Sequence, residues 1–227
     1  MTPAAALPAR PRTARIDVAP LERPDHADYV GLLALPAEAQ QILTMDPVGP
    51  LATHGTALCL TARLRRSSSP KPVGAVFAAS PDWAYQHPLT LDDPGLAHVL
   101  ARTALLVYGV ATAPNRRRQG IARALLTETE NRARAAGYRM TTLLHTPELT
   151  GFYEHLGYTT ARHVTIAMPD AGIGLTQPPP FLTAVKALRP DVRIRMLPGA
   201  PGPVVTGLLP GWDLPTGARF EDGRLIA

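Results

Sequence analysis

Three consecutive arginines precede a glycine in the stretch APNRRRQGIARALL, residues 113–126, which then continues with helical spacing. A helix N-terminus leaves backbone N–H groups unpaired and carries the positive end of the helix dipole, so it favours phosphate. Gly120 lets the backbone approach a ligand closely, and Ala122 keeps the next turn small. Arginine binds phosphate oxygens through two parallel hydrogen bonds. The stretch therefore indicates either a cradle for a strongly anionic ligand or a solvated basic run.

The basic charge of the chain is concentrated around this stretch. Between Arg116 and Arg139 there are seven arginines against Glu128 and Glu130, an excess that equals the net charge of +5 for all 227 residues. A protein that binds DNA usually needs a longer basic stripe with interleaved aromatic residues. Aromatic residues make up only 5% of the chain, so we expect a local anion and no nucleic acid as partner.

Several other classes of site lack support in the sequence. Cys59 is the only cysteine, and the seven histidines show no HxH or HExxH spacing, so neither a disulfide nor a metal site is expected. The start of the chain lacks the apolar segment of a signal peptide, and no apolar stretch approaches the ~18 residues that cross a bilayer. These features predict a soluble, cytoplasmic protein with no membrane partner.

The first half of the chain reads as strands and short helices that precede the basic stretch. Alternating apolar residues and turn signals predict the following elements: a strand over 14–21, one or two helices over 25–43 broken at Pro36, a hairpin of strands over 56–64 and 73–80, a loop over 81–97, and a strand over 101–114 buried on both faces.

A strand–helix–strand unit surrounds the basic stretch. Ile121, Leu125, Thr129 and Ala133 recur every four residues, and Gly137 lies where a glycine commonly ends a helix. The segments that follow predict a strand over 138–145, a short helix over 148–158 and a last strand over 159–169. The two strands that flank the long helix predict a right-handed βαβ unit, with the arginines at the N-terminus of its helix.

Residues 170–227 differ in character from the rest, because proline and glycine interrupt them every few residues. Short apolar runs lie between these interruptions, and Asp222-Gly223 predicts a two-residue hairpin turn. We interpret this segment as an extension that packs either on the core or on a second subunit, the latter in a homodimer. A disordered tail is the alternative interpretation.

Two motifs make the sequence similar to a known family. The stretch VATAPNRRRQGIARALL resembles the acetyl-CoA-binding motif Q/R-x-x-G-x-G/A of the GNAT N-acetyltransferases, with Arg117, Gly120 and Ala122 at its defined positions. The stretch GFYEHLGY resembles the second signature of that family, a helix ending in F/L-Y-E-x-x-G-F/Y. The resemblance is strong over 101–169. It implies an α/β fold with a mixed, mostly antiparallel sheet flanked by helices, in a domain spanning 14–169 and followed by the extension of 170–227.

The resemblance also implies roles for individual residues. By this resemblance, the Tyr153 hydroxyl would donate a proton or a hydrogen bond to the sulfur of the departing CoA. Thr146 stands where many members of the family carry an asparagine, and it would contact the pantetheine arm. The remaining implied contacts to acetyl-CoA come from the strand before the cradle and from the cradle itself: Val110, Ala111, Thr112, Arg117, Arg118, Gln119, Gly120, Ile121, Ala122 and Arg123.

The activity implied by the resemblance is direct transfer of an acetyl group from acetyl-CoA to a primary amine in a ternary complex. An amine-bearing small molecule and a protein amine are both open as acceptors. The candidates for the general base by approximate location, none of them preferred, are Asp82, Asp92, Asp93, His98 and Glu148. The alternative is a module on the same fold that binds or senses acyl-CoA without catalysis.

Overall fold

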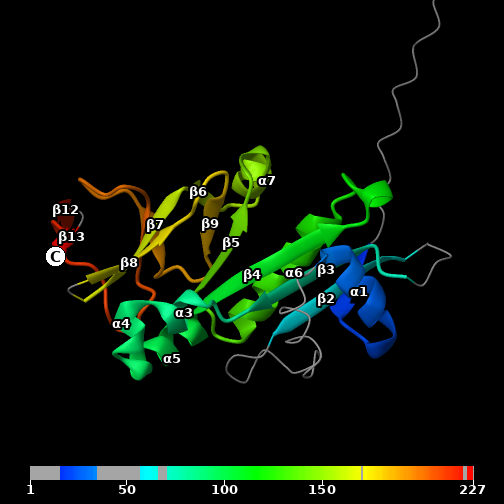
Figure 1. Cartoon of the computed structure of the whole chain (residues 1–227), viewed down its shortest axis with the longest axis horizontal. Coiled ribbons are helices and arrows are strands. Elements are labelled where there is room, and N and C mark those ends of the chain that lie inside the picture. The colour runs from blue at the N-terminus through cyan, green and yellow to red at the C-terminus, as the bar shows by residue number, and fades with distance from the viewer. Residues whose placement is uncertain (1–15, 35–56, 66–70, 170, 222–223, 227) are drawn as a thin grey trace, which may run out of the picture.

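The computed structural model describes residues 16–34, 57–65, 71–169, 171–221 and 224–226 (Figure 1). Its largest feature is a seven-stranded sheet with the order β1-β2-β3-β4-β5-β9-β6. These strands are β1 (Ile16–Pro20), β2 (Leu58–Leu64), β3 (Gly74–Ala79), β4 (Ala104–Thr112), β5 (Met140–His145), β6 (Thr159–Ala161) and β9 (Leu182–Ala187). Neighbouring strands are antiparallel except β4 and β5, so the sheet is mixed and mostly antiparallel, as the sequence predicts.

Helices cover this sheet and connect its strands. They are α1 (His26–Leu33), α3 (Trp83–Gln86), α4 (Pro88–Leu91), α5 (Pro94–Thr103), α6 (Ile121–Ala135) and α7 (Thr150–His155), with 3-10 turns η1 (Arg23–Asp25), η2 (Pro114–Arg116) and η3 (Pro147–Leu149). The parallel strands β4 and β5 flank α6 and form the predicted βαβ unit. Gly137, with φ of 93°, ends the helix as expected. The second predicted helix of 25–43, beyond Ala34, lies outside the described residues.

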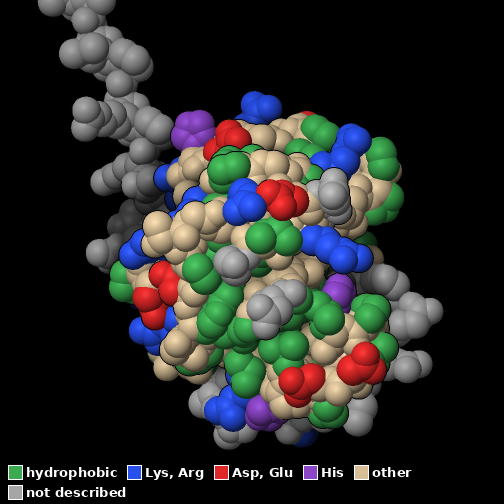
Figure 2. Space-filling model, turned by 90° about the vertical axis from the view of Figure 1, so that its left-hand side faces the viewer, with side chains coloured by type: hydrophobic (Ala, Val, Ile, Leu, Met, Phe, Trp, Pro, Cys, Tyr) green, Lys and Arg blue, Asp and Glu red, His purple; other side chains and the backbone are tan. Residues whose placement is uncertain are grey.

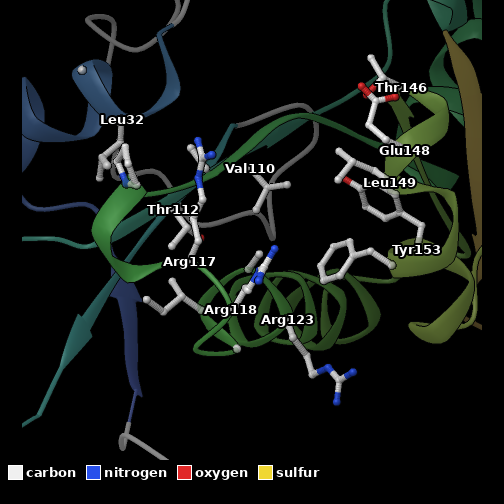
Figure 3. A pocket seen from close by; sticks show the side chains of 17 residues that line it. Leu32, Val110, Thr112, Arg117, Arg118, Arg123, Thr146, Glu148, Leu149 and Tyr153 are labelled. Atoms are coloured by element: carbon white, nitrogen blue, oxygen red, sulfur yellow. The ribbon is translucent and has the colours of Figure 1, made fainter. Parts of the chain in front are cut away.

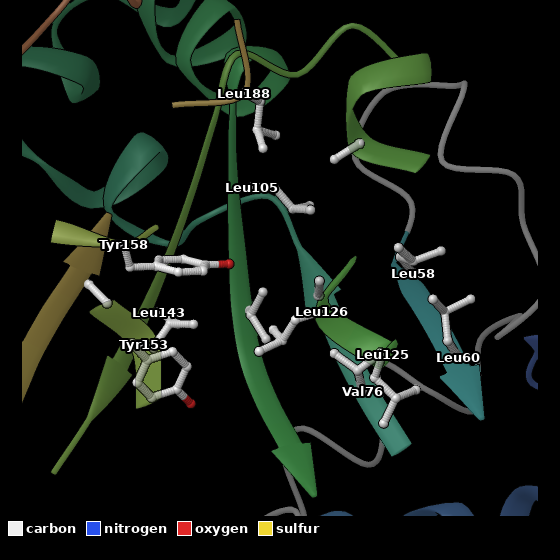
Figure 4. Packing of buried hydrophobic residues seen from close by; sticks show 14 of the residues in the cluster. Leu58, Leu60, Val76, Leu105, Leu125, Leu126, Leu143, Tyr153, Tyr158 and Leu188 are labelled. Carbon is white, nitrogen blue, oxygen red and sulfur yellow. The ribbon is translucent and has the colours of Figure 1, made fainter. Parts of the chain in front are cut away.

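The main hydrophobic core lies between the sheet and α6. Leu125 and Leu126 of α6 belong to one cluster with Leu60, Val76 and residues of three further strands, and all of these side chains are buried (Figure 4). Tyr153 and Tyr158 extend the same core towards β5 and β9 (Figure 4). The helix that opens at the arginines is therefore held rigidly on the sheet by its apolar face.

The segment 159–169 forms two strands instead of the single strand predicted. β6 ends at Ala161 and pairs with β9, whereas β7 (His163–Met168) joins a second sheet of order β10-β11-β7-β8. The other strands of that sheet are β8 (Ala171–Thr176), β10 (Arg193–Arg195) and β11 (Val204–Thr206). Apolar alternation continues through Arg162, so the sequence pattern contains no sign that the pairing partner changes there.

The segment after residue 169 is part of the folded core. β9 lies between β5 and β6 in the main sheet, so a boundary at 169/170 divides that sheet. Ile173 and Val205 of this segment pack with Leu100 and Met140 in a second buried cluster. The last hairpin pairs β12 (Arg219–Glu221) with β13 (Arg224–Ile226), as predicted, while its turn at 222–223 lies outside the described residues. Figure 2 views the end of the molecule that carries this hairpin and α4, where apolar side chains lie among scattered acidic and basic ones.

The segment 81–97 is helical, which corrects its interpretation as a loop. Pro88 and Pro94 occupy first-turn positions of α4 and α5, where proline is favoured. The Asp93 carboxylate accepts a hydrogen bond from the backbone of Leu96 and caps α5. The helices α3 and α4 are each four residues long, too short to show a helical period in the sequence. No helix in the described ranges is both long and apolar enough to cross a membrane.

Candidate active site

A cleft of about 790 Å³ lies between the second half of β4, the start of α6, and the segment η3–α7 (Figure 3). Figure 3 shows Val110 and Thr112 on one side with the arginines below, while Leu149 and Tyr153 approach from the other side. The lining residues are Gly31, Leu32, Val110, Ala111, Thr112, Pro114, Arg117, Arg118, Gly120, Ile121, Ala122, Arg123, Thr146, Glu148, Leu149, Phe152 and Tyr153.

The cleft opens where two parallel strands separate. β4 and β5 pair from Ala104 to Val107, and the pairing ends at Val107 opposite Leu143. A register shift against β3 leaves Tyr108 as an extra residue in β4 at this point. The following residues, 109–112, pair with β3 but have no partner on the β5 side in the described sheet. Their free backbone groups face the cleft and are available to an extended polar ligand.

The loop before α6 has an unusual backbone. Gly120 is the N-cap of α6 with φ of 82°, and Arg118 has φ of 62°, a left-handed conformation that is uncommon for a residue with a side chain. A Cβ atom placed on Gly120 would meet no heavy atom within 4 Å, so the space above it is open. Backbone outliers of this kind concentrate at ligand-binding sites.

The arginines at the two ends of α6 have different surroundings. Arg132 and Arg134, near its C-terminus, form ion pairs with Glu128 and Glu130. The arginines that line the cleft, at 117, 118 and 123, form no ion pair with any described residue. Three exposed cations beside a helix N-terminus create a strongly positive potential, which favours a phosphate group.

Tyr153 is held in place by aromatic neighbours. Its ring is 4% exposed and lies 4.9 Å from the ring of His145, 5.1 Å from Phe152 and 5.8 Å from Tyr158, measured between centroids. Its hydroxyl end points into the cleft (Figure 3). Burial raises the pKa of Tyr153 to about 12, because the charged phenolate is poorly solvated there. The phenol is therefore a hydrogen-bond donor at neutral pH.

The structure brings most of the sequence-predicted residues together. All of them line the cleft except Gln119, which lines a neighbouring cavity that also contacts Arg118, Gly120 and Arg123. The sequence reasoning did not name Leu32, Pro114 or Phe152 as cleft residues. Phe152 stands directly before Tyr153 in the second motif, and this position is a signal in the sequence that could have identified Phe152 as a cleft residue.

Thr112 presents a buried hydroxyl to the cleft, and this hydroxyl has no hydrogen-bond partner in the described part of the chain.

The five candidate bases are dispersed. Only Glu148 lines the cleft. Asp93 caps α5, and His98 lies beside Arg102 on that helix. The Asp82 carboxylate accepts a hydrogen bond of 2.5 Å from the Tyr108 hydroxyl. No group of three or more potential metal ligands occurs within the described ranges.

Comparisons with known proteins agree with this architecture. Residues 75–160 match the model of the acetyltransferase (GNAT) domain. This chain carries a GNAT acetyltransferase domain. The match covers β3, the βαβ unit and the helix of Tyr153, and so includes both motifs of the cleft. It identifies the domain as that of an acetyl-CoA-dependent acyltransferase.

Solved structures show the same GNAT fold at low sequence identity. An acetyltransferase of the GNAT family from Staphylococcus aureus Mu50 is 10% identical, with a TM-score of 0.52 over 77% of this chain and 100% of its own. A chain of the NatC complex bound to Gag peptide and CoA is 15% identical, with a TM-score of 0.51 over 77% of this chain and 99% of its own. A GNAT family acetyltransferase from Elizabethkingia anophelis with acetyl-CoA bound is 16% identical, covering 76% and 97% of the two chains with a TM-score of 0.47. No curated protein sequence matched the chain.

Proposed function

We propose that the protein transfers the acetyl group of acetyl-CoA directly to a primary amine, within a ternary complex. The observation that supports this proposal most strongly is the cleft itself. It combines a stretch of β4 that lacks a partner strand on the β5 side, a glycine-capped helix N-terminus with three arginines that form no ion pair with a described residue, and a buried tyrosine whose hydroxyl faces inwards. These features match, in order, the amide arm, the phosphates and the sulfur of acetyl-CoA.

Each part of the cleft has a distinct binding task. The backbone groups of 110–112 would hydrogen-bond the amide arm, and Thr146 would contribute from the opposite wall. The N–H groups at the start of α6 would bind the pyrophosphate, with Arg117, Arg118 and Arg123 neutralising its charge. Gln119, in the adjoining cavity, would contact the ligand where it leaves the cleft.

The chemical step needs a stabilised leaving group. The neutral amine nitrogen attacks the thioester carbonyl, a C–N bond forms, the C–S bond breaks, and the sulfur takes the electron pair. The amine gives up its proton to solvent or to a nearby base. Because the pKa of Tyr153 is about 12 and that of a thiol is about 8.5, complete proton transfer to the sulfur is uphill. Tyr153 therefore acts chiefly by donating a hydrogen bond to the developing thiolate.

The test measures cofactor binding and turnover separately. Calorimetry with acetyl-CoA should show binding, and a thiol-reactive dye should show CoA release that depends on an added primary amine. Amines of different class, including small diamines, amino acids and peptides with a free N-terminus, form the panel. Tight binding of acetyl-CoA with no amine-dependent CoA release across the panel would favour the alternative of a non-catalytic sensing module. Absence of binding would contradict both.

A further inference from the structure

A second cavity, of about 510 Å³, lies on the other face of the main sheet from α6. Short helices α3 and α4 form one wall, and strands β4, β5, β8 and β9 form the rest. Its lining residues are Asp82, Trp83, Gln86, His87, Pro88, Leu106, Thr142, Leu144, Gly174, Leu175, Gln177 and Thr183. This volume falls within the range of small-molecule sites.

Strand alternation shows that the two cavities use opposite faces of β4 and β5. Val107 and Leu143 belong to the core under α6, whereas Leu106 and Leu144 line the second cavity. Leu144 directly follows Leu143, where pairing with β4 ends. The second cavity therefore reaches the sheet at the point where β4 and β5 separate, and that separation also opens the proposed acetyl-CoA cleft.

The charges around the two cavities are opposite. The cleft is lined by three arginines and one glutamate, whereas the second cavity is lined by one carboxylate, Asp82, and by no lysine or arginine among the described residues. The hydroxyl of Tyr108 donates to Asp82 Oδ1 at 2.5 Å and lies 3.1 Å from the carbonyl oxygen of Ser80. Tyr108 is the extra residue of β4, so the strand irregularity that accompanies the opening of the sheet also orients this carboxylate.

The other lining groups suit an apolar body with polar substituents. Trp83, Leu106, Leu144 and Leu175 supply apolar walls, and Leu144 is 49% exposed there. The Trp83 Nε1 and Thr183 Oγ1 atoms are buried without a hydrogen-bond partner in the described part of the chain. Buried polar atoms without partners are rare and commonly mark a bound water or ligand.

We propose that this second cavity binds the acetyl acceptor, and that the acceptor is a small cationic amine with an apolar body, for which Asp82 supplies the counter-charge. The assignment rests on the proposed acetyl transfer and specifies the substrate class of that reaction. A positively charged group can donate a charge-assisted hydrogen bond to the Asp82 carboxylate. An acceptor that carries a carboxylate meets the like charge of Asp82 in this cavity and finds no lysine or arginine among the described lining residues.

The experiment compares two amines of the same shape. p-Xylylenediamine and 4-(aminomethyl)benzoate share a benzylic primary amine but carry an ammonium and a carboxylate, respectively, at the far end. CoA release with each is measured at saturating acetyl-CoA, and acetyl-CoA affinity is measured separately by calorimetry. We expect kcat/KM for the diamine to exceed that for the carboxylate by at least about 10-fold.

Two variants connect this preference to the cavity. Asp82→Asn keeps an oxygen that can accept from Tyr108 but removes the charge, so KM for the diamine should rise about 10- to 100-fold with acetyl-CoA affinity unchanged. Glu22→Gln removes an exposed carboxylate that does not line the cavity and should leave KM unchanged. Leu144→Lys places a cation in the cavity and should reverse the preference between the two amines.

The possible outcomes separate the two proposals. Normal binding of acetyl-CoA with no turnover of the diamine, or an unchanged KM in Asp82→Asn, would overturn the acceptor assignment and leave the cofactor cleft standing. An equal rise of KM in Glu22→Gln would also overturn it, because the effect would then reflect surface charge in general. Failure of the wild-type protein to bind acetyl-CoA would overturn the proposed acetyl transfer, and the acceptor assignment with it.

Discussion

Arg118 and Gly120 both adopt left-handed backbone conformations, with φ of 62° and 82°, and only Gln119 separates them. Two such residues on either side of a single residue turn the chain sharply before α6. This turn places the first N–H groups of the helix at the end of the cleft, beside three arginines that have no carboxylate partner in the described part of the chain. The backbone of the loop, as much as its charge, would therefore form the proposed anion cradle.

Replacement of Gly120 by valine should abolish acetyl-CoA binding while the protein still folds. The new side chain would occupy the open space through which the pyrophosphate approaches, and the left-handed backbone would cost about 1–2 kcal/mol of stability. Gly137→Val is the matched control, since Gly137 also has a positive φ and open space at Cβ but lies at the far end of α6. Calorimetry should show lost affinity only in Gly120→Val, and unchanged affinity there would refute the cofactor assignment.

Replacement of Arg117 by alanine should weaken acetyl-CoA binding by about 1–3 kcal/mol, the contribution of a charge-assisted contact. Its neighbour Arg116 does not line the cleft, so Arg116→Ala serves as the control for a general loss of positive charge. The difference between the two variants should shrink as salt is added, because exposed charges are screened. Equal affinities for the two variants at low salt would show that Arg117 makes no specific contact.

The sequence predicted those parts of the fold that depend on local patterns. The periodicity of α6, the glycine at 137 and the buried strands on either side were enough to predict the βαβ unit and to place the arginines at the N-terminus of its helix. The extra residue Tyr108 in β4 and the insertion of β9 between β5 and β6 depend on pairing between segments far apart in the chain. No local pattern encodes such partners, so the second cavity and its carboxylate had no sequence signature.

A chain truncated after Pro169 should lose its cooperative fold. The truncation removes β9, which pairs with both β5 and β6, and it removes Val185 from a buried cluster. A chain that ends at Gly211 keeps the main sheet and loses only the last hairpin with its small cluster, so it should retain acetyl-CoA binding at reduced stability. Thermal unfolding and light scattering compare the two and also test whether the extension supports a dimer. Equal stability of both truncated chains would show that β9 is dispensable.

Alkaline pH should lower the free energy of unfolding, because two buried groups resist ionisation in the folded state. Burial raises the pKa of Tyr153 to about 12 and that of Cys59 to about 11, so the folded state holds these protons more tightly than the unfolded chain. The free energy of unfolding should be insensitive to these groups below about pH 8, where both are protonated in both states, and should fall between about pH 8 and 12. Denaturant titrations at several pH values in this range measure how steeply the free energy of unfolding falls with pH. This fall should be less steep in Tyr153→Phe. An identical slope in the variant would show that Tyr153 ionises as easily folded as unfolded.

Removal of the Tyr153 hydroxyl should separate catalysis from binding. Tyr153→Phe keeps the ring packed against His145 and Tyr158, so turnover should fall about 10²–10⁴-fold while acetyl-CoA affinity changes little.

Tyr158→Phe is the matched control for that change. The hydroxyl of Tyr158 donates to the buried carboxylate of Glu130, so its loss should lower the melting temperature and leave turnover nearly intact. Because the pKa of Tyr153 is about 12, wild-type turnover should show no alkaline decline from this residue below about pH 10. If Tyr153→Phe instead loses stability and keeps its full rate with the acceptor that the protein turns over best, the tyrosine serves only the core. The thiolate would then need another donor in the cleft, and Thr146 on the opposite wall would be the next hydroxyl to remove.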